Sequence, residues 1–97
     1  MNITVKPKPH GANYMKKILR FTASWCGPCK ALATNLEKAD IKTPIEVIDV
    51  DENNALAAEY GIRGVPTLIM IEENIEVKRM SGNKTVEELK EWVGNGN

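Results

Sequence analysis

The stretch Trp25-Cys26-Gly27-Pro28-Cys29-Lys30 holds both cysteines of the 97-residue chain and directly follows the apolar residues 18–23. The apolar run predicts a strand, and Pro28 predicts that a helix begins next, because proline is tolerated in a first helical turn. Cys26 then lies at a helix N-terminus, where unpaired backbone N–H groups favour a thiolate. Cys29 lies within bonding reach. The pair therefore predicts dithiol–disulfide chemistry, in which an accessible Cys26 sulfur attacks and Cys29 resolves.

Two other roles for the cysteine pair are weaker. A zinc site normally needs four ligands, and the chain adds only His10, which stands among prolines upstream. A purely structural disulfide between Cys26 and Cys29 would close a very small ring, which removes little entropy from the unfolded chain. No metal site is therefore expected.

The cysteine stretch resembles the active-site motif of the thioredoxin family. A second stretch, Tyr60-Gly61-Ile62-Arg63-Gly64-Val65-Pro66-Thr67-Leu68, is similar to the family's segment that carries a cis-proline opposite the active site. Gly82 matches a glycine that follows the next strand. The resemblance covers roughly residues 17–93, and its two motifs are well separated in the chain.

The resemblance implies a protein-disulfide reductase. Cys26 forms a mixed disulfide with the substrate, Cys29 breaks it, and an NADPH-dependent thioredoxin reductase regenerates the dithiol. No cofactor is bound, because the Cys26–Cys29 disulfide is itself the redox group. Active-site support is expected from Trp25, Gly27, Pro28, Lys30 and Arg20, and substrate contacts from Trp25, Gly64, Val65, Pro66 and Gly82.

A groove for extended substrates follows from the same resemblance. With a cis bond before Pro66, Val65 offers its backbone N–H and C=O groups to a substrate chain in the manner of strand addition. Such a groove reads peptide backbone more than side chains. Two alternatives to a general reductase stay open: a disulfide oxidant or isomerase, which has a higher redox potential, and a binding subunit of a larger assembly, whose cysteines are dispensable.

Length and composition fit one compact domain over residues 1–97. A hydrophobic content of 42% suits a single core in a chain of this size. No stretch approaches the roughly 18 consecutive apolar residues of a membrane span, and residues 1–10 lack the apolar region of a secretory signal. We therefore expect a monomer that contacts no membrane and works in the reducing cytoplasm.

Charge is balanced overall but unevenly placed. Residues 1–42 hold eight Lys/Arg and two Asp/Glu, whereas residues 43–97 hold five and eleven. The simplest interpretation is that the two halves occupy different parts of one solvated surface. Prolines and Gly11 separate the N-terminal lysines, so they form no basic patch on one element, and nucleic acid is not an expected partner.

The order of the predicted elements predicts an α/β fold with a central mixed sheet flanked by helices, as in the thioredoxin fold. A crossover helix makes the first two main strands parallel, and a hairpin adds antiparallel ones. Proline and glycine leave too little sequence for the family's first helix, which is expected to be absent or reduced to a turn. The predicted elements are an irregular segment 1–15 with an edge strand at 3–5, strands 16–23, 45–50, 67–72 and 75–81, helices 28–39, 53–60 and 86–93, and a tail 94–97.

Turns and caps delimit several of these elements. Asn53 or Asn54 is expected to cap the short helix, and Gly61 to end it. Asparagine tolerates left-handed backbone, which places the hairpin turn at residues 73–74. Thr85 and Glu88 have the spacing of a capping box at the start of the last helix.

Arg20 departs from the family pattern, which usually has a buried aspartate at this position, six residues before the first cysteine. Arginine stays protonated at ordinary pH and cannot accept the proton of the resolving thiol. An unpaired buried charge is costly, so Arg20 is expected to reach solvent or to pair with Asp49 or Asp51. The hypothesis is that a missing first helix leaves this sheet face partly open, and that the Arg20 charge favours the thiolate and makes the pair more oxidising.

Overall fold

The computed structural model of the chain describes residues 15–94. The predicted strand at residues 3–5, the predicted loss of a first helix, His10 and residues 95–97 lie outside the described residues. Along the chain the elements are β1 (Lys16–Thr22), α1 (Gly27–Ala39), β2 (Ile45–Asp49), α2 (Asn54–Glu59), β3 (Thr67–Glu72), β4 (Ile75–Ser81) and α3 (Val86–Val93).

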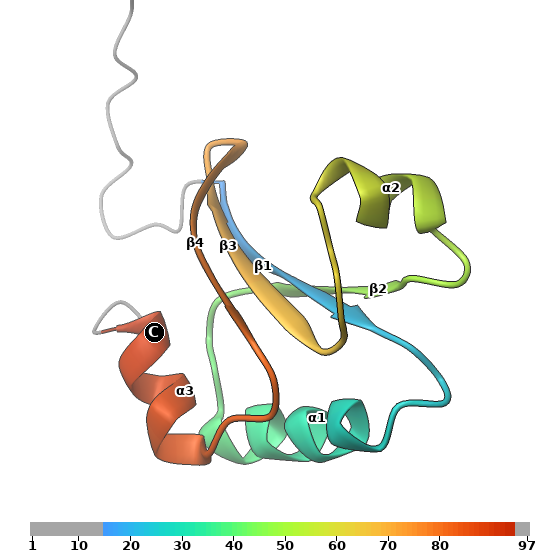
Figure 1. The fold of residues 1–97 in the computed structure, drawn as a ribbon. Helices are drawn as coiled ribbons and strands as arrows, with labels where there is room; N and C mark the ends of the chain where they lie inside the picture. Colours follow the sequence, from blue (N-terminus) through green and yellow to red (C-terminus); the bar gives the residue numbers. More distant parts are fainter. Residues whose placement is uncertain (1–14, 95–97) are drawn as a thin grey trace, which may run out of the picture.

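The strands form a mixed sheet in the order β2-β1-β3-β4 (Figure 1). β1 and β2 are parallel, and α1 provides the crossover between them. β3 pairs antiparallel with both β1 and β4. The predicted fold class is therefore confirmed. Because β1 and β2 are parallel, the segments that follow them leave the same edge of the sheet, and this edge carries the cysteines.

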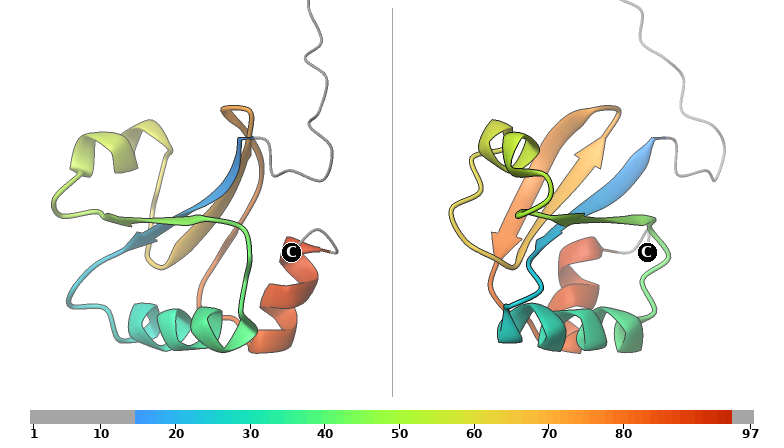
Figure 2. Two further views of the ribbon diagram at one scale, coloured as in Figure 1. Left: turned by 180° about the vertical axis from the view of Figure 1, so that it is seen from behind. Right: turned by 90° about the vertical axis from the view of Figure 1, so that its right-hand side faces the viewer.

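Helices cover both faces of the sheet (Figure 2). α1 and α3 pack together on one face over a core that includes Ile18, Leu32 and Leu89, none of which is exposed. α2 lies on the other face, over a second core that includes Phe21 and Ile69, which are also fully buried. Alternate residues of β1 enter the two cores, as expected for a strand covered on both sides.

The boundaries of four elements differ from the predictions by one residue, and α2, which spans Asn54–Glu59 instead of 53–60, differs at both ends. β1 ends at Thr22 instead of Ala23, α1 begins at Gly27 instead of Pro28, and β2 ends at Asp49 instead of Val50. The last difference is slight, because the Val50 N–H still donates to the Thr22 carbonyl at 2.9 Å. The chain after β2 therefore stays bonded to β1 at the edge of the sheet that carries the cysteines.

The predicted turns and caps agree with the structure at all but one position. Glu73 and Asn74 both have positive φ, at 52° and 69°, which suits the tight turn between β3 and β4. Thr85 and Glu88 form the predicted capping box of α3. Asn53 is the N-cap residue of α2, as predicted, but its side chain makes no capping hydrogen bond and donates instead to the Asp49 carbonyl at 3.3 Å.

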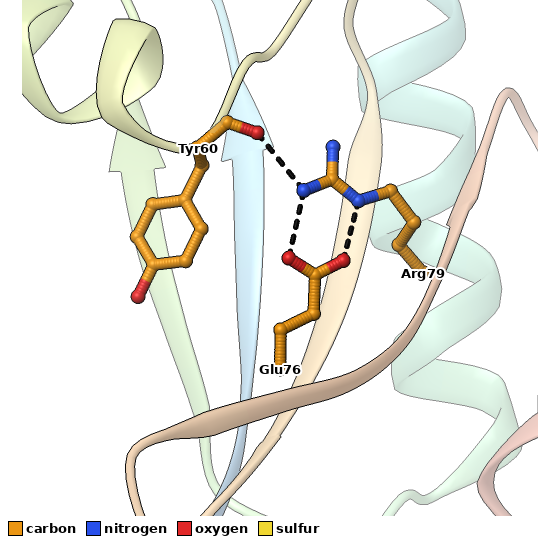
Figure 3. Close-up of polar contacts among 3 residues, drawn as sticks. All are labelled: Tyr60, Glu76 and Arg79. Carbon is orange, nitrogen blue, oxygen red and sulfur yellow. Dashed lines mark hydrogen bonds and ion pairs between the residues drawn. The ribbon is translucent and has the colours of Figure 1, made fainter.

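A β-bulge in β4 places Arg79 so that it bonds to the end of α2. In a regular strand, Glu76 and Arg79 would point to opposite faces, but the bulge opposite Met70 and Ile71 turns both toward α2. Arg79 donates through Nε and Nη2 to both carboxylate oxygens of Glu76, at 2.6 and 2.8 Å, and Nη2 also donates to the Tyr60 carbonyl at 2.9 Å (Figure 3). The chain is thus held where it leaves α2 toward the segment around Pro66.

Candidate active site

The two cysteines form a disulfide at the start of α1, with a Cα–Cα distance of 5.2 Å. Cys26 is the N-cap residue, with extended backbone, and its Sγ accepts a hydrogen bond of 3.1 Å from the Cys29 N–H. This N–H is one of those that a helix start leaves without an intrahelical partner. In the reduced protein it would stabilise negative charge on Cys26, with no acidic side chain in the first turn to oppose it.

The cysteines are more enclosed than the sequence suggested. Only 4% of Cys26 and 1% of Cys29 is exposed, because Ala23, Val50 and Val65 pack against the pair. The expectation of an accessible Cys26 sulfur is therefore not met in the disulfide form. Two groups flank Cys26, the segment that precedes β3 and the Trp25 side chain.

The segment before β3 provides one of these flanking groups. Val65 places its carbonyl oxygen 3.7 Å from Cys26 Sγ, and the Val65–Pro66 peptide bond is cis. The Thr67 hydroxyl donates to the Gly64 carbonyl at 2.8 Å, and the Gly82 N–H donates to the Pro66 carbonyl at 2.9 Å. These bonds tie Gly64 to Thr67 and Pro66 to Gly82, and Val65 is the residue of this segment that packs against the cysteine pair.

Trp25 provides the second flanking group. It is 69% exposed, so its side chain is no part of a core, and its indole N–H donates to Asp51 Oδ2 at 2.8 Å. Sequence reasoning missed this role of Asp51, although a signal existed: Trp25 and Asp51 follow two parallel strands and so leave the same sheet edge. We call Gly64, Val65 and Pro66 the Pro66 segment. A hollow of about 170 Å³, the front hollow, lies between Trp25 and this segment. Its lining includes Trp25, Val50, Ile62, Arg63, Gly64 and Val65.

The remaining residues of the motif surround the start of α1. Gly27, Pro28 and Lys30 are exposed, and Pro28 occupies the first turn as predicted. Lys30 lines a second hollow of about 260 Å³, the rear hollow, which lies on the α1 face behind Cys29. The lining of the rear hollow includes Arg20, Thr22, Ser24, Cys29, Lys30 and Asp49.

Of the two alternatives predicted for Arg20, exposure to solvent or an ion pair with Asp49 or Asp51, the structure shows the first, because the residue stays partly exposed. It lies on β1 beneath α1, is half-buried, and makes no hydrogen bond or ion pair with any residue in 15–94. Asp51 bonds to Trp25, while Asp49 Oδ1 accepts backbone N–H groups from residues 51 and 52. Burial lowers the pKa of the Arg20 guanidinium, because desolvation disfavours its charged form.

The described residues bear on two further features, a metal site and a membrane-spanning helix. No three His, Cys, Asp or Glu side chains within residues 15–94 are grouped so that they could hold a metal ion. None of the helices in this part is long and apolar enough to cross a bilayer.

Comparison with known proteins identifies the family. Residues 11–95 match the thioredoxin family model. The thioredoxin of Bacillus subtilis is 43% identical over 77 residues, which cover 75% of this chain and 74% of that protein. A thioredoxin of Staphylococcus epidermidis is 40% identical over 79 residues, covering 77% and 76%.

Solved structures agree with these sequence matches. A mutant thioredoxin from Halobacterium salinarum superimposes with a TM-score of 0.74 at 38% identity, over 81% of this chain and 72% of that one. The thioredoxin of Fasciola hepatica gives a TM-score of 0.73 at 32% identity, over 84% and 80%. The redox group of such proteins is their disulfide, here Cys26–Cys29. The chain therefore belongs to the thioredoxin family and is a thiol-disulfide oxidoreductase of the protein-disulfide reductase type.

Proposed function

We propose that this protein is a general reductant of protein disulfides, and that an NADPH-dependent thioredoxin reductase recycles it in the cytoplasm. It would act as a monomer and a single domain. The observation that carries the proposal is the cysteine pair at the start of α1, where the Cys29 N–H donates to Cys26 Sγ at 3.1 Å. A hydrogen bond from a helix N-terminus stabilises a thiolate more than a thiol, so Cys26 is the proposed nucleophile.

The proposed reaction passes two electrons to the substrate in two exchanges. The Cys26 thiolate bonds to one sulfur of the substrate disulfide, and the other substrate sulfur leaves as a thiolate. Cys29 then loses its proton and attacks Cys26 Sγ, which closes the Cys26–Cys29 disulfide and expels the second substrate sulfur. In the closed pair the Cα–Cα distance of 5.2 Å lies within the range that a disulfide requires.

Substrate binding is assigned to the groups that flank Cys26. The segment of Gly64, Val65 and Pro66 would bind an extended substrate chain through backbone groups, as a strand added beside it. Gly82, which donates to the Pro66 carbonyl, would support this segment. Trp25 and the front hollow would receive one apolar substrate side chain, since most residues around that hollow are apolar. Backbone recognition of this kind favours a broad range of substrates.

The remaining motif residues are proposed to shape the start of α1. Pro28 has a fixed φ that suits a first turn, and Gly27 lets the chain bend into it. Lys30 adds a positive charge at the rear hollow, which it lines together with Cys29.

Insulin reduction coupled to NADPH oxidation tests the proposal, with a candidate thioredoxin reductase present. We expect steady NADPH consumption with the wild type and none with Cys26→Ser. We expect Cys29→Ser to accumulate a mixed disulfide with insulin, because the attacking sulfur remains and the resolving one is gone. Failure of every reductase to reduce the protein would refute the recycling step. A biological role that survives replacement of both cysteines by serine would favour a binding subunit.

A further inference from the structure

Arg20 is an unusual charge for the place that it occupies. It is half-buried on β1, and no carboxylate among residues 15–94 pairs with it. A guanidinium cannot lose its proton at ordinary pH, so it keeps its charge despite partial desolvation. A charge of this kind favours any state of the protein in which negative charge appears nearby.

The rear hollow joins this charge to the redox pair. Arg20 and Cys29 line it together, and Cys29 is otherwise enclosed, with 1% of its surface exposed. Arg20 also lines an outer hollow of about 530 Å³ between α1 and β2, whose lining includes Arg20, Ala33, Thr34, Glu37, Asp40 and Val47. Arg20 therefore borders the cysteine pair from behind, on the side away from Trp25 and Val65, where solvent is partly excluded and screens charge less than bulk water does.

The other charged groups around the two hollows partly oppose one another. Lys30 and Asp49 line the rear hollow, and Glu37 and Asp40 line the outer one. Lys30, Glu37 and Asp40 are exposed and therefore well screened by solvent, whereas Asp49 and Arg20 are half-buried. Arg20 and Asp49 are thus the charges of opposite sign that should act most strongly on the pair.

We propose that Arg20 tunes the redox potential of the Cys26–Cys29 pair by stabilising its reduced form through the rear hollow. When two glutathione thiols reduce the disulfide, they leave as one glutathione disulfide, and the pair gains two electrons. The pair then holds a Cys26 thiolate and a Cys29 thiol, with the second proton released to water. Its charge changes from zero to minus one, and the Arg20 cation favours this change. Arg20 is a positioning residue in this role, and the inference rests on the proposed ionisation of Cys26.

Equilibration with glutathione tests the inference on the full chain. Arg20→Met keeps the apolar stem and removes the charge. We expect the equilibrium constant for reduction of the pair to fall about fivefold, which is ~20 mV for a two-electron couple. Arg20→Lys, which retains the charge, should stay within about twofold of the wild type. The rate of Cys26 alkylation at pH 7 should fall in Arg20→Met, since less of the thiol is ionised.

Matched variants separate the charge effect from a structural one. Asp49→Asn keeps the Oδ1 acceptor and removes the opposing charge, so it should shift the potential in the other direction. Lys38→Met removes a positive charge from α1 at a residue that lines neither hollow, and should leave the potential unchanged. An unchanged potential in Arg20→Met, or equal shifts in Arg20→Met and Arg20→Lys, would overturn the inference.

The glutathione equilibrium involves neither a reductase nor a protein substrate. If no thioredoxin reductase recycles the protein but Arg20→Met still shifts the redox potential, only the proposed function is refuted. If the protein reduces insulin normally but the expected shifts in redox potential are absent, only the inference is refuted.

Discussion

The two sides of the redox pair are built differently. At the front, Trp25 bonds to Asp51, and the Pro66 segment is held by hydrogen bonds from Thr67 and Gly82. At the back, Arg20 lines the rear hollow together with Cys29 and has no ion partner in the described residues. Groups at the front are bonded in fixed positions, which suits recognition of substrates. The charge at the back should favour the reduced, negatively charged form of the cysteines. The front should therefore govern the kinetics of substrate reduction, and the back should govern the redox potential.

Trp25→Ala should give the largest effect, and at the front alone. Removing the indole takes one wall from the front hollow, and we expect kcat/KM for insulin reduction to fall about tenfold, which corresponds to ~1.4 kcal/mol of lost transition-state binding. The glutathione potential should stay at the wild-type value, because no charge is removed. A shifted potential with unchanged insulin kinetics would break the division between the two sides.

Thr85→Ala provides a reference away from both sides. It removes the N-cap of α3, whose hydroxyl accepts the Glu88 N–H at 3.1 Å, and should lower the free energy of unfolding by about 1 kcal/mol. Urea unfolding measures this loss. Neither kcat/KM at low temperature nor the potential should change; if either does, a loss of stability alone explains part of the effects of the other variants.

Ala33→Glu should oppose Arg20 from the back. Ala33 lines both the outer and the rear hollow, so a glutamate there can reach the guanidinium and neutralise it. We expect the equilibrium constant for reduction to fall about threefold, or ~15 mV, with KM for insulin unchanged. A variant whose potential equals that of the wild type would show that charge at this position does not act on the cysteines.

Loss of the Glu76 charge should give the smallest effect, which is on stability. Glu76 pairs with Arg79, which also bonds the Tyr60 carbonyl at the end of α2, and we call these contacts the clamp. The pKa of Glu76 is lowered, first by the side-chain hydrogen bond from Arg79. A depressed pKa in the folded state means that stability is present above the unfolded value of about 4.3 and is lost as pH falls through the lower folded value. The loss should be only a few tenths of a kcal/mol, because the pair is exposed to solvent.

Thermal unfolding between pH 6 and pH 3 measures this contribution. Glu76→Gln should lack the part of the acid destabilisation that the clamp causes. Lys17→Met serves as a control, since it breaks another exposed ion pair, with Glu46, on a different strand. An identical pH profile for Glu76→Gln and the wild type would show that the clamp contributes nothing.

The fold followed from local features of the sequence to within about a residue. The capping box of Thr85 and Glu88, the turn at Glu73 and Asn74, and Pro28 at the start of α1 each depend on the conformational preferences of one or two residues. Such preferences act over a few bonds and are visible in the sequence itself. Asn53 is the N-cap residue of α2, but it lacks the capping hydrogen bond because its side chain bonds to the end of β2 instead, a contact that helix preferences do not describe.

Other features of the site depend on contacts between distant segments. Nothing in the local sequence indicates that Asp51 takes the indole N–H of Trp25, or that the Val65 carbonyl lies beside Cys26. Each contact joins two segments that meet because β1, β2 and β3 are neighbours in the sheet. The predicted parallel pairing of β1 and β2 already put Trp25 and Asp51 at one edge of the sheet, whereas the packing of the whole core decided which side chains meet there.

The sequence alone determined the chemistry of this protein: two cysteines at a helix start, close enough to form a disulfide, are a property of six consecutive residues. The tertiary structure decided the surroundings of that pair, including how enclosed it is and that Arg20 borders Cys29 without an ion partner in the described residues. The physical reason is range. A helix start is set by backbone conformation within one turn, whereas burial and electrostatic environment are set by segments that lie tens of residues apart along the chain.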